Sequence, residues 1–404
     1  MSCCDKPGLL PVEDALARLL ALAEQSPISE CETLPLADAD GRVLAEPLLA
    51  GLDLPPWPNS AMDGYALRLS DWQGKALPVS QKIFAGQAGE PLQPGTCVRI
   101  FTGAPVPQGA DCVEMQENAE VLEDGRVRFL EVMEAGQHIR PQGQEARKGD
   151  CVLPTGTRIG PIEIGLAASL GHAELKVRRR PRVALLSTGD ELLEPGTPMR
   201  PGCIYNSNRT LLRHWLDALG CEVIDAGILP DRPQHTRLRL EQLQHGADLI
   251  LTTGGVSAGD ADCLGQVLRD SGRPLFWKLA IKPGKPLTVG YFGQVPVIGL
   301  PGNPASALVT FGLLARAYLL RLQGVQEVAP LSVEVPVAFA WPKAGKRREY
   351  LRARLENGRA VLYPNQSSGV LLGASWADGL VEIVEGRTLQ AGDRAPFIPF
   401  SELF

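Results

Sequence analysis

The chain has 404 residues, of which 44% are hydrophobic, 21% charged and 5% aromatic, and its formal net charge is −6. This length predicts two to four domains of about 150 residues each, and the negative charge argues against a nucleic-acid-binding protein, which needs a basic surface. No apolar run approaches the roughly 20 residues that span a bilayer, and the N-terminus lacks the basic start and apolar core of a secretory signal.

The nine cysteines and five histidines are scattered along the chain, without a C-x-x-C or an H-x-x-x-H pair. Single thiols at scattered positions are typical of a reducing compartment. We therefore expect a cytoplasmic protein with neither a zinc site nor a catalytic histidine, and with no nucleic-acid or membrane partner.

The first half of the chain predicts one helix, a long β region and a second helix. Residues 11–26 read as an amphipathic helix that begins at Pro11 with two acidic residues in its first turn. From 43 to 157 the apolar runs are short and are separated by Gly and Pro at intervals of about ten residues, which is an all-β pattern. A helix at 161–170 is expected to lie next to the first helix, and the basic run 178–182 predicts a solvated linker between domains.

From residue 182 onward, strands alternate with helices, which predicts βαβ units and a mostly parallel, doubly wound sheet. The predicted strands are 182–189, 222–229, 248–254, 275–281 and 295–300, and the predicted helices are 207–220, 232–246, 262–270 and 303–322. From about 330 to the end, short strands separated by Gly, Pro and Asn return.

The predicted fold class is a multidomain α/β plus β protein with a central doubly wound α/β domain. We expect an N-terminal helical and linker domain of 1–45 with 146–178, an inserted β domain of 46–145, an α/β domain of 179–328, and a small, barrel-like C-terminal β domain of 329–404.

Three polar loops follow predicted strands of the α/β domain, at 187–192, 252–262 and 299–307, and 280–286 adds two lysines across a Pro-Gly turn. Ligands of open α/β sheets bind beyond the carboxyl ends of the strands. Exposed amides and lysines suit phosphate oxygens, whereas the loop carboxylates suit a hard cation such as magnesium, which takes one or two carboxylates plus phosphates and water. The loops therefore predict a phosphorylated ligand that carries a metal ion.

Each of these features also has a purely structural interpretation. The Gly254-Gly255 pair could form only a turn, Asp260 and Asp262 could cap the following helix, and the two lysines could be solvated. The P-loop pattern G-x-x-x-x-G-K-[ST] is absent, which argues against ordinary ATP hydrolysis.

The loop motifs STGDEL (187–192), GGVSAGDAD (254–262), KPGKP (282–286) and LPGNP (300–304) resemble those of the molybdopterin-binding domain. Upstream, PPWPNSAMDGYALR (55–68) and FTGAPVP (101–107) resemble the molybdopterin molybdenumtransferases. The resemblance covers essentially the whole chain. SAMDGYA is its most specific element, because adenylyltransferases that share the α/β domain lack it.

The resemblance implies that molybdenum from molybdate is inserted into adenylated molybdopterin, with magnesium present and AMP and molybdenum cofactor released. It implies magnesium and nucleotide contacts for Asp190, Glu191 and Asp262, and a close backbone approach to phosphates at Gly254 and Gly255. Further substrate-binding residues implied on the same edge are Asn208, Asp260, Pro301, Gly302, Asn303 and Pro304.

For molybdate, the resemblance implies a set of cationic and hydroxyl side chains that can replace the hydration of an oxyanion. These are Ser257, Lys282, Lys285, Arg352 and Ser368. By itself, the run 346–354 around Arg352 reads as a solvated strand face.

Asp63, Thr102 and Gly103 belong to the β domain, which in the family's elongated homodimer faces the α/β domain of the other subunit. The molybdopterin adenylyltransferase and recipient molybdoenzymes are the protein partners that the family implies.

The sequence departs from the family pattern at three places. Family members commonly have Asp at the position of Pro58, G-E-D where this chain has Gly143-Gln144-Glu145, and often Asp at the position of Asn206. The sequence therefore leaves open two alternatives to the insertase: a non-catalytic carrier or scaffold that binds molybdopterin or the cofactor, and an adenylyltransferase.

Overall fold

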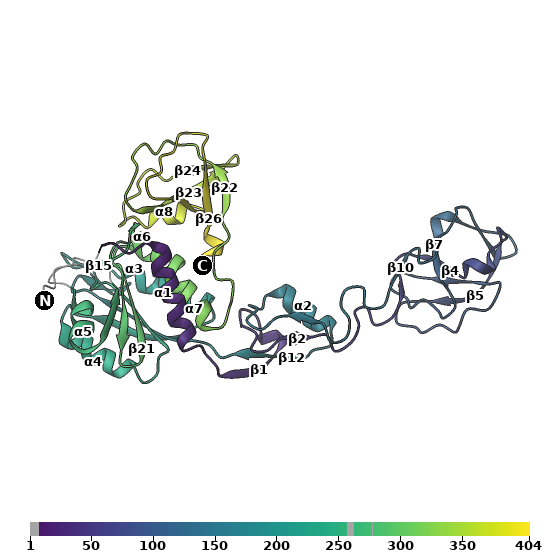
Figure 1. Ribbon diagram of the computed structural model, residues 1–404, viewed down its shortest axis with the longest axis horizontal. Coiled ribbons are helices and arrows are strands. Elements are labelled where there is room, and N and C mark those ends of the chain that lie inside the picture. The colour runs from purple at the N-terminus through teal and green to yellow at the C-terminus, as the bar shows by residue number, and fades with distance from the viewer. Residues whose placement is uncertain (1–7, 257–261, 277) are drawn as a thin grey trace.

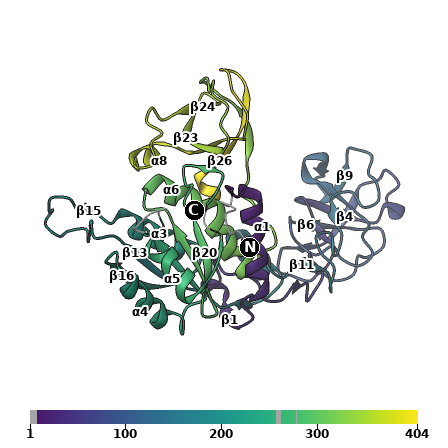
Figure 2. The same ribbon diagram turned by 60° about the vertical axis from the view of Figure 1, so that its left-hand side comes forward.

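The computed structural model describes residues 8–256, 262–276 and 278–404. The molecule is elongated: a β domain lies at one end, the α/β unit and the C-terminal β domain lie at the other, and a narrow segment joins them (Figure 1). Both views place the C-terminal domain against the α6 end of the α/β unit (Figure 2).

The N-terminal β domain is built on a six-stranded sheet in the order β7-β4-β6-β5-β9-β8. Successive residues of β4 point to opposite faces: Tyr65 and Leu67 belong to one apolar cluster and Ala66 to another. Both faces are therefore buried. The strands are β4 (Gly64–Leu67), β5 (Leu77–Ile83), β6 (Cys97–Ile100), β7 (Cys112–Met115), β8 (Ala119–Val121) and β9 (Arg126–Phe129).

The chain enters and leaves this β domain through paired antiparallel strands, so the domain is an insertion in the neighbouring one. β1 pairs with β12, β2 with β11 and β3 with β10. Their bounds are β1 (Cys31–Pro35), β2 (Leu48–Leu49), β3 (Asn59–Ser60), β10 (Ile139–Arg140), β11 (Cys151–Leu153) and β12 (Glu174–Arg178), with helix α2 (Pro161–Ser169) beside them.

The prediction that the helix at 161–170 lies next to the first helix is wrong. α1 (Val12–Gln25) buries Ala15 and Leu19 in the core of the α/β unit, among residues of its last helix, whereas α2 contributes Ala167 to a separate cluster with Leu44. The amphipathic pattern predicted the helix correctly. Its apolar face gives no information about which other element covers it.

The α/β unit has a six-stranded sheet in the order β16-β13-β17-β21-β20-β18. The first four strands are parallel, and β20 and β18 form an antiparallel edge. The strands are β13 (Arg182–Thr188), β16 (Glu222–Leu229), β17 (Leu249–Thr253), β18 (Arg273–Phe276), β20 (Thr288–Phe292) and β21 (Val295–Leu300). The predicted doubly wound, mostly parallel sheet is confirmed.

Helices cover both faces of this sheet, as a buried parallel sheet requires. On β13, Val183 and Leu185 face the cluster that contains α1, α3, α6 and α7, while Ala184 and Leu186 face α4 and α5. The helices are α3 (Ser207–Ala218), α4 (Pro233–Leu243), α5 (Cys263–Ser271), α6 (Pro304–Thr310) and α7 (Arg316–Leu322); a π-helical turn, Phe311–Ala315, joins the last two.

The predicted strand at 275–281 is wrong as a single element. β18 ends at Phe276, Trp277 lies outside the described residues, and β19 (Ile281–Lys282) pairs with β23 of the C-terminal domain. The antiparallel strand β20, which lies between β21 and the edge strand β18, was not predicted. Short apolar runs do not show which sheet they join, and here two sheets share one apolar stretch.

The segment 304–322 is, among the described residues, the one helix long and apolar enough to span a bilayer, so the sequence-based statement that no such run exists is wrong. Residues such as Leu314, Tyr318 and Leu319 are buried in the main core, and 89% of the apolar window is buried inside the molecule. Its apolar surface is therefore explained as that of a core helix.

The C-terminal domain is a six-stranded sheet that includes β19 from the α/β unit. Its other elements are β22 (Val333–Pro336), β23 (Arg348–Glu356), β24 (Arg359–Leu362), β25 (Gly379–Ile383), β26 (Arg394–Pro399) and α8 (Leu372–Trp376). The last residue also joins the units: the Phe404 ring stacks on Trp215 of α3, with ring centroids 3.8 Å apart. The C-terminal domain is thus held beside the carboxyl edge of the parallel sheet.

Candidate functional site

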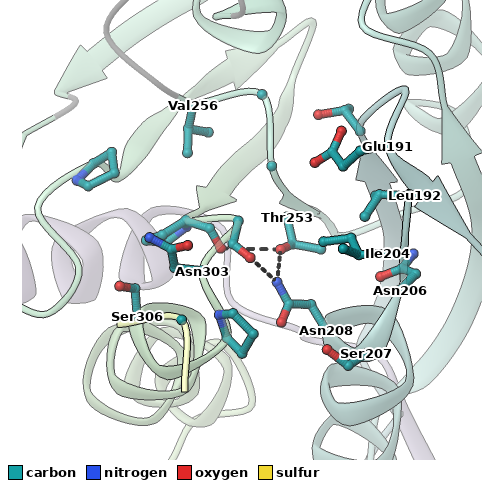
Figure 3. Close-up of a pocket in the computed structure, with 18 of the residues that line it drawn as sticks. Glu191, Leu192, Ile204, Asn206, Ser207, Asn208, Thr253, Val256, Asn303 and Ser306 are labelled. Carbon is teal, nitrogen blue, oxygen red and sulfur yellow. Dashed lines mark hydrogen bonds between the residues drawn. The ribbon is translucent and has the colours of Figure 1, made fainter. Parts of the chain in front are cut away.

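A cavity of about 510 Å³ lies beyond the carboxyl ends of the four parallel strands (Figure 3). It is lined by residues from the loops after β13, β16, β17 and β21, and by the first turn of α3. The lining residues include these members of the predicted set: Glu191, Asn208, Gly254, Gly255, Pro301, Gly302, Asn303 and Pro304. The cavity lies at the edge of the sheet where the rule for open α/β sheets places ligands, and its role as the substrate site stays a prediction.

At the Gly254-Gly255 turn, the end of β17 comes close to the end of β13. Both glycines have positive φ, +86° and +62°. A Cβ on Gly254 would lie 2.3 Å from the Thr188 carbonyl oxygen, and one on Gly255 would lie 2.5 Å from Thr188 Oγ1. No other residue fits here without displacing a neighbouring strand. The two glycines therefore form a tight backbone bend that places no side chain of its own in the cavity wall, and their close approach to phosphates stays a prediction.

The floor of the cavity is held by hydrogen bonds that join three elements. Asn208 on α3 donates from Nδ2 to Thr253 Oγ1 on β17 at 3.0 Å and to the Gly302 carbonyl at 2.7 Å (Figure 3). Thr253 Oγ1 donates in turn to the Pro301 carbonyl at 3.3 Å. The LPGNP loop is thus fixed relative to the sheet before any ligand binds.

Two carboxylates line the cavity, Glu191 and Asp231, and Asp190 lies close enough to Asp231 to affect its charge. Burial raises the pKa of Asp231 above its ordinary value, and repulsion from Glu191 and Asp190 raises it further. Asp231 was missed by the sequence analysis. It lies two residues after the end of β16, so the strand-end rule that selected the other loops would have found it.

Asp262 caps a helix in the described structure. Its Oδ1 accepts from the Gly265 amide at 2.9 Å and its Oδ2 lies 3.3 Å from Arg269 Nη1, at the N-terminus of α5. Burial raises its pKa above the ordinary value. This is the capping alternative of the sequence analysis; the metal-ligand role stays a prediction. Ser257 and Asp260, also predicted at the site, lie outside the described residues.

The two lysines of the KPGKP loop lie outside the wall of the cavity. Lys282 Nζ pairs with Glu349 Oε2 of β23 at 3.0 Å, and Lys285 is exposed. Among the described residues, the cavity lining contains two acidic side chains and no Lys or Arg. A phosphate bound inside it would therefore need its charge balanced by another cation.

Arg352 is a buried residue, 2% exposed, rather than a member of the solvated strand face that the run 346–354 suggested. Its guanidinium donates to the carbonyl oxygens of Asn365, Ser367 and Val370, and its Nε donates to Gln366 Oε1. Burial lowers its pKa. Arg352 thereby shapes the 365–370 loop, and four of its five N–H donors are used within the protein. Its role as a molybdate ligand stays a prediction.

Ser368 in this loop contacts the LPGNP segment. Its Oγ accepts from Asn303 Nδ2 at 3.0 Å, and its carbonyl accepts from the Ala305 amide at 3.0 Å. Gly369 lines the cavity. The C-terminal domain therefore closes one side of the cavity and satisfies an amide at the start of α6.

Asp63, Thr102 and Gly103 lie together at the far end of the molecule, in the N-terminal β domain (Figure 1). Asp63 Oδ1 accepts from the Thr102 amide and hydroxyl, both at 2.8 Å. These two bonds hold the pKa of Asp63 below its ordinary value, and the bond from the Thr102 amide has the larger effect. One chain does not bring this cluster to the cavity.

The departures from the family pattern have defined structural positions. Asn206 caps α3, with Oδ1 accepting from the Arg209 amide at 3.2 Å, a role that Asp fills equally well. The Pro58 carbonyl accepts from the Val106 amide at 3.0 Å, which requires no side-chain carboxylate.

Three family models match the chain in order. Residues 10–171 match the MoeA N-terminal region (domain I and II), residues 184–321 a probable molybdopterin binding domain, and residues 334–400 the MoeA C-terminal region (domain IV). The chain belongs to the molybdopterin molybdenumtransferase family. The resemblance inferred from the motifs and the multidomain fold class are thereby confirmed.

Individual relatives support the assignment over most of their length. The chain is 44% identical over 322 residues to a molybdopterin molybdenumtransferase of Haemophilus influenzae, covering 79% of each chain. It is 39% identical over 369 residues to molybdopterin molybdenumtransferase 2 of Mycobacterium tuberculosis, covering 87% of this chain and 91% of that one. The crystal structure of a molybdopterin biosynthesis moeA protein from Pyrococcus horikoshii superposes with a TM-score of 0.83 at 29% identity, covering 97% of this chain and 100% of that chain. Members of this enzyme family are transferases, as the relatives' names state.

Proposed function

We propose that this molybdopterin molybdenumtransferase inserts molybdenum from molybdate into adenylated molybdopterin and releases AMP and molybdenum cofactor. The observation that carries the proposal is the cavity itself, in which a side-chain-free Gly254-Gly255 floor faces Glu191 and Asp231. An anionic ligand in such a cavity needs a metal ion between its phosphates and the carboxylates.

The donor set at the cavity fits magnesium. Glu191 and Asp190 would hold the ion, together with phosphate oxygens and water, since magnesium takes one or two carboxylates. No cluster of three or more His, Cys, Asp or Glu is found in the described part of the chain, which fits an ion completed by substrate. When bound, magnesium supplies Lewis-acid stabilisation of the charge that develops on departing AMP. Asp262 could contribute a carboxylate oxygen there while it keeps its bond from the Gly265 amide, because an ionised carboxylate has further acceptor sites.

We place molybdate, which is a substrate, where the KPGKP loop meets the C-terminal domain. Lys282, Lys285 and Ser368 would bind its oxygens, with Ser257 from the segment outside the described residues and the remaining N–H donor of Arg352. Glu349 holds Lys282 in place through the 3.0 Å ion pair. The printed contacts of Lys282, Ser368 and Arg352 hold these three groups in place before an oxyanion binds.

We also propose a homodimer in the cytoplasm. The Asp63–Thr102 cluster is remote from the cavity of its own chain, so it can reach a site only on another copy. The seven described cysteines are free thiols, as the predicted reducing compartment requires. Protein partners of the proposed dimer would be the adenylyltransferase that supplies the substrate and the molybdoenzymes that receive the product.

The test is AMP release from adenylated molybdopterin by the purified protein with magnesium, in the presence and absence of molybdate. Molybdate-dependent release, with a product that activates an apo-molybdoenzyme, would support the proposal. Glu191→Gln should lower the rate at least about tenfold, whereas Asp270→Asn, which removes the same charge at an exposed end of α5, should not. Binding without release would mean a carrier, and ATP-dependent AMP transfer to molybdopterin would mean an adenylyltransferase.

A further inference from the structure

The strand that leads into the KPGKP loop is held between an N-terminal and a C-terminal segment of the chain. On one side, the Leu10 amide donates to the Lys278 carbonyl at 2.9 Å, and the Ala280 amide donates to the Leu10 carbonyl at 2.8 Å. On the other side, the Arg348 amide donates to the Ala280 carbonyl at 2.9 Å, and the pairing of β19 with β23 follows. We call these three segments the interdomain joint; it consists of residues 10, 278–282 and 348–349.

The side chain of Arg348 ties the interdomain joint to the α/β core. Its Nη1 pairs with Glu13 in the first turn of α1 and lies 3.3 Å from Glu382 Oε1 on β25, and its Nη2 lies 3.2 Å from Glu385 Oε2. Helix α1 packs in the core of the α/β unit, whereas both other glutamates belong to the C-terminal domain, which lies beyond the first turn of α1 (Figure 1). One guanidinium therefore connects the two units.

The pair with Glu13 is too exposed to contribute much to the stability of the fold. The Glu13 side chain is 59% exposed, whereas that of Arg348 is 17% exposed, with an Nε that is buried and has no hydrogen-bond partner among the described residues. Exposed ion pairs contribute little to the free energy of unfolding. The pair forms only while β23 lies beside the start of α1, so it favours this orientation of the C-terminal domain by up to the free energy of the pair.

This orientation matters because β23 and its neighbours carry the groups of the proposed molybdate site. Arg348 directly precedes Glu349, which pairs with Lys282 at 3.0 Å. Arg352, on the same strand, binds the Ser367 carbonyl, and the next residue of that loop accepts a hydrogen bond from the LPGNP segment of the α/β unit. A shift of β23 relative to α1 would therefore move these groups together, away from the α/β side of the site.

We propose that Arg348 is a positioning residue, which holds the C-terminal domain against α1 through Glu13 and thereby sets the geometry of the molybdate site. Neither of these two residues lines the cavity. Arg348 touches no substrate in this assignment and acts through the strand that carries Glu349 and Arg352. The inference rests on the proposed function, because that function places molybdate where the KPGKP loop meets the C-terminal domain.

The test compares substitutions at two neighbouring acidic residues of α1 in the full chain. Glu13→Gln removes one partner of Arg348, and Glu13→Lys repels the guanidinium. Asp14→Asn and Asp14→Lys make the same changes of charge at an exposed residue for which no ion pair is found in the described chain. Both acids lie in the first turn, so each pair of variants changes the interaction with the helix dipole by a similar amount.

Molybdate binding is measured by calorimetry, and hydrogen exchange is followed in peptides that cover 278–282 and 346–350. We expect Glu13→Gln to weaken molybdate binding about threefold and Glu13→Lys about tenfold, with exchange in both peptides at least about threefold faster. In AMP release, KM for molybdate should rise while kcat stays within about twofold. The melting midpoint of Glu13→Gln should stay within about 2 °C of the wild type, and the Asp14 variants should match the wild type in binding and exchange.

The outcomes separate this inference from the proposed function. Unchanged molybdate affinity in the Glu13 variants, or equal losses at Glu13 and Asp14, would overturn the positioning role. Faster exchange without weaker molybdate binding would overturn it as well, because the interdomain joint would then not govern the site, and so would a wild-type protein that binds no molybdate. Selective weakening by the Glu13 variants in a protein that never releases AMP would keep the positioning role and reject only the insertase.

Discussion

Replacing Lys282 by Ala should destabilise the protein more than replacing its partner Glu349 by Gln. The ion pair is asymmetric: the Glu349 side chain is 8% exposed, whereas the Lys282 side chain is 50% exposed. Lys282→Ala leaves a buried carboxylate without a partner, while Glu349→Gln leaves an ammonium group that water still reaches.

The expected magnitudes follow from this difference in burial. Breaking a fully buried pair from one side costs about 3–5 kcal/mol, and because Lys282 is half solvated we expect about 2 kcal/mol for Lys282→Ala. Exposed pairs contribute about 0.5 kcal/mol, which is the expected cost of Glu349→Gln. At about 3 °C per kcal/mol for units of this size, the melting midpoints should fall by about 6 °C and about 1.5 °C.

The measurement is thermal unfolding of both variants, compared by the midpoint of the same transition because a multidomain chain need not unfold in one step. The double variant Lys282→Ala with Glu349→Leu removes both charges and should recover most of the loss. Equal losses in the two single variants, or a double variant as unstable as Lys282→Ala, would refute the argument from burial.

Three other outcomes test the geometry. Gly255→Ala should lower the rate of AMP release at least about tenfold and the free energy of unfolding by about 1–2 kcal/mol. The reason is that residue 255 has a φ of +62° and that the alanine Cβ would lie 2.5 Å from Thr188 Oγ1. A variant that releases AMP at the wild-type rate would contradict the close approach. Asp231→Asn should raise the melting midpoint at neutral pH. The pKa of Asp231 is higher in the folded protein than in the unfolded chain, so the protein loses stability as the pH rises from the unfolded pKa through the folded pKa. The gain should disappear in acid, and a lower midpoint of the variant at pH 7 would show that burial and repulsion do not destabilise the charged carboxylate. Thr102→Val should raise the pKa of Asp63 measured by NMR but leave it below 3.8, because the Thr102 amide still donates; an unchanged pKa would show that the hydroxyl contributes nothing.

The sequence by itself determined most of the local elements and the edge of the sheet where the cavity lies. Strand and helix periods are properties of neighbouring residues, so the alternation after residue 182 predicted the parallel sheet. Parallel strands bring their carboxyl ends to one edge, which is why Glu191, Gly254 and Asn303 were placed in one cavity without any distance information. The turn at Gly254-Gly255 could also be predicted from the sequence, since only glycine fits it.

Only the tertiary structure decided which partner each element and side chain has. An apolar helix face does not show which surface covers it. The helix α1 was therefore expected to lie beside α2, although it packs in the core of the α/β unit. Residues 281–282 join another sheet, and the Arg352 guanidinium binds carbonyl oxygens that come 13 to 18 residues later. Such pairings depend on how distant segments meet in space, and a residue's type and its neighbours in sequence do not encode that meeting.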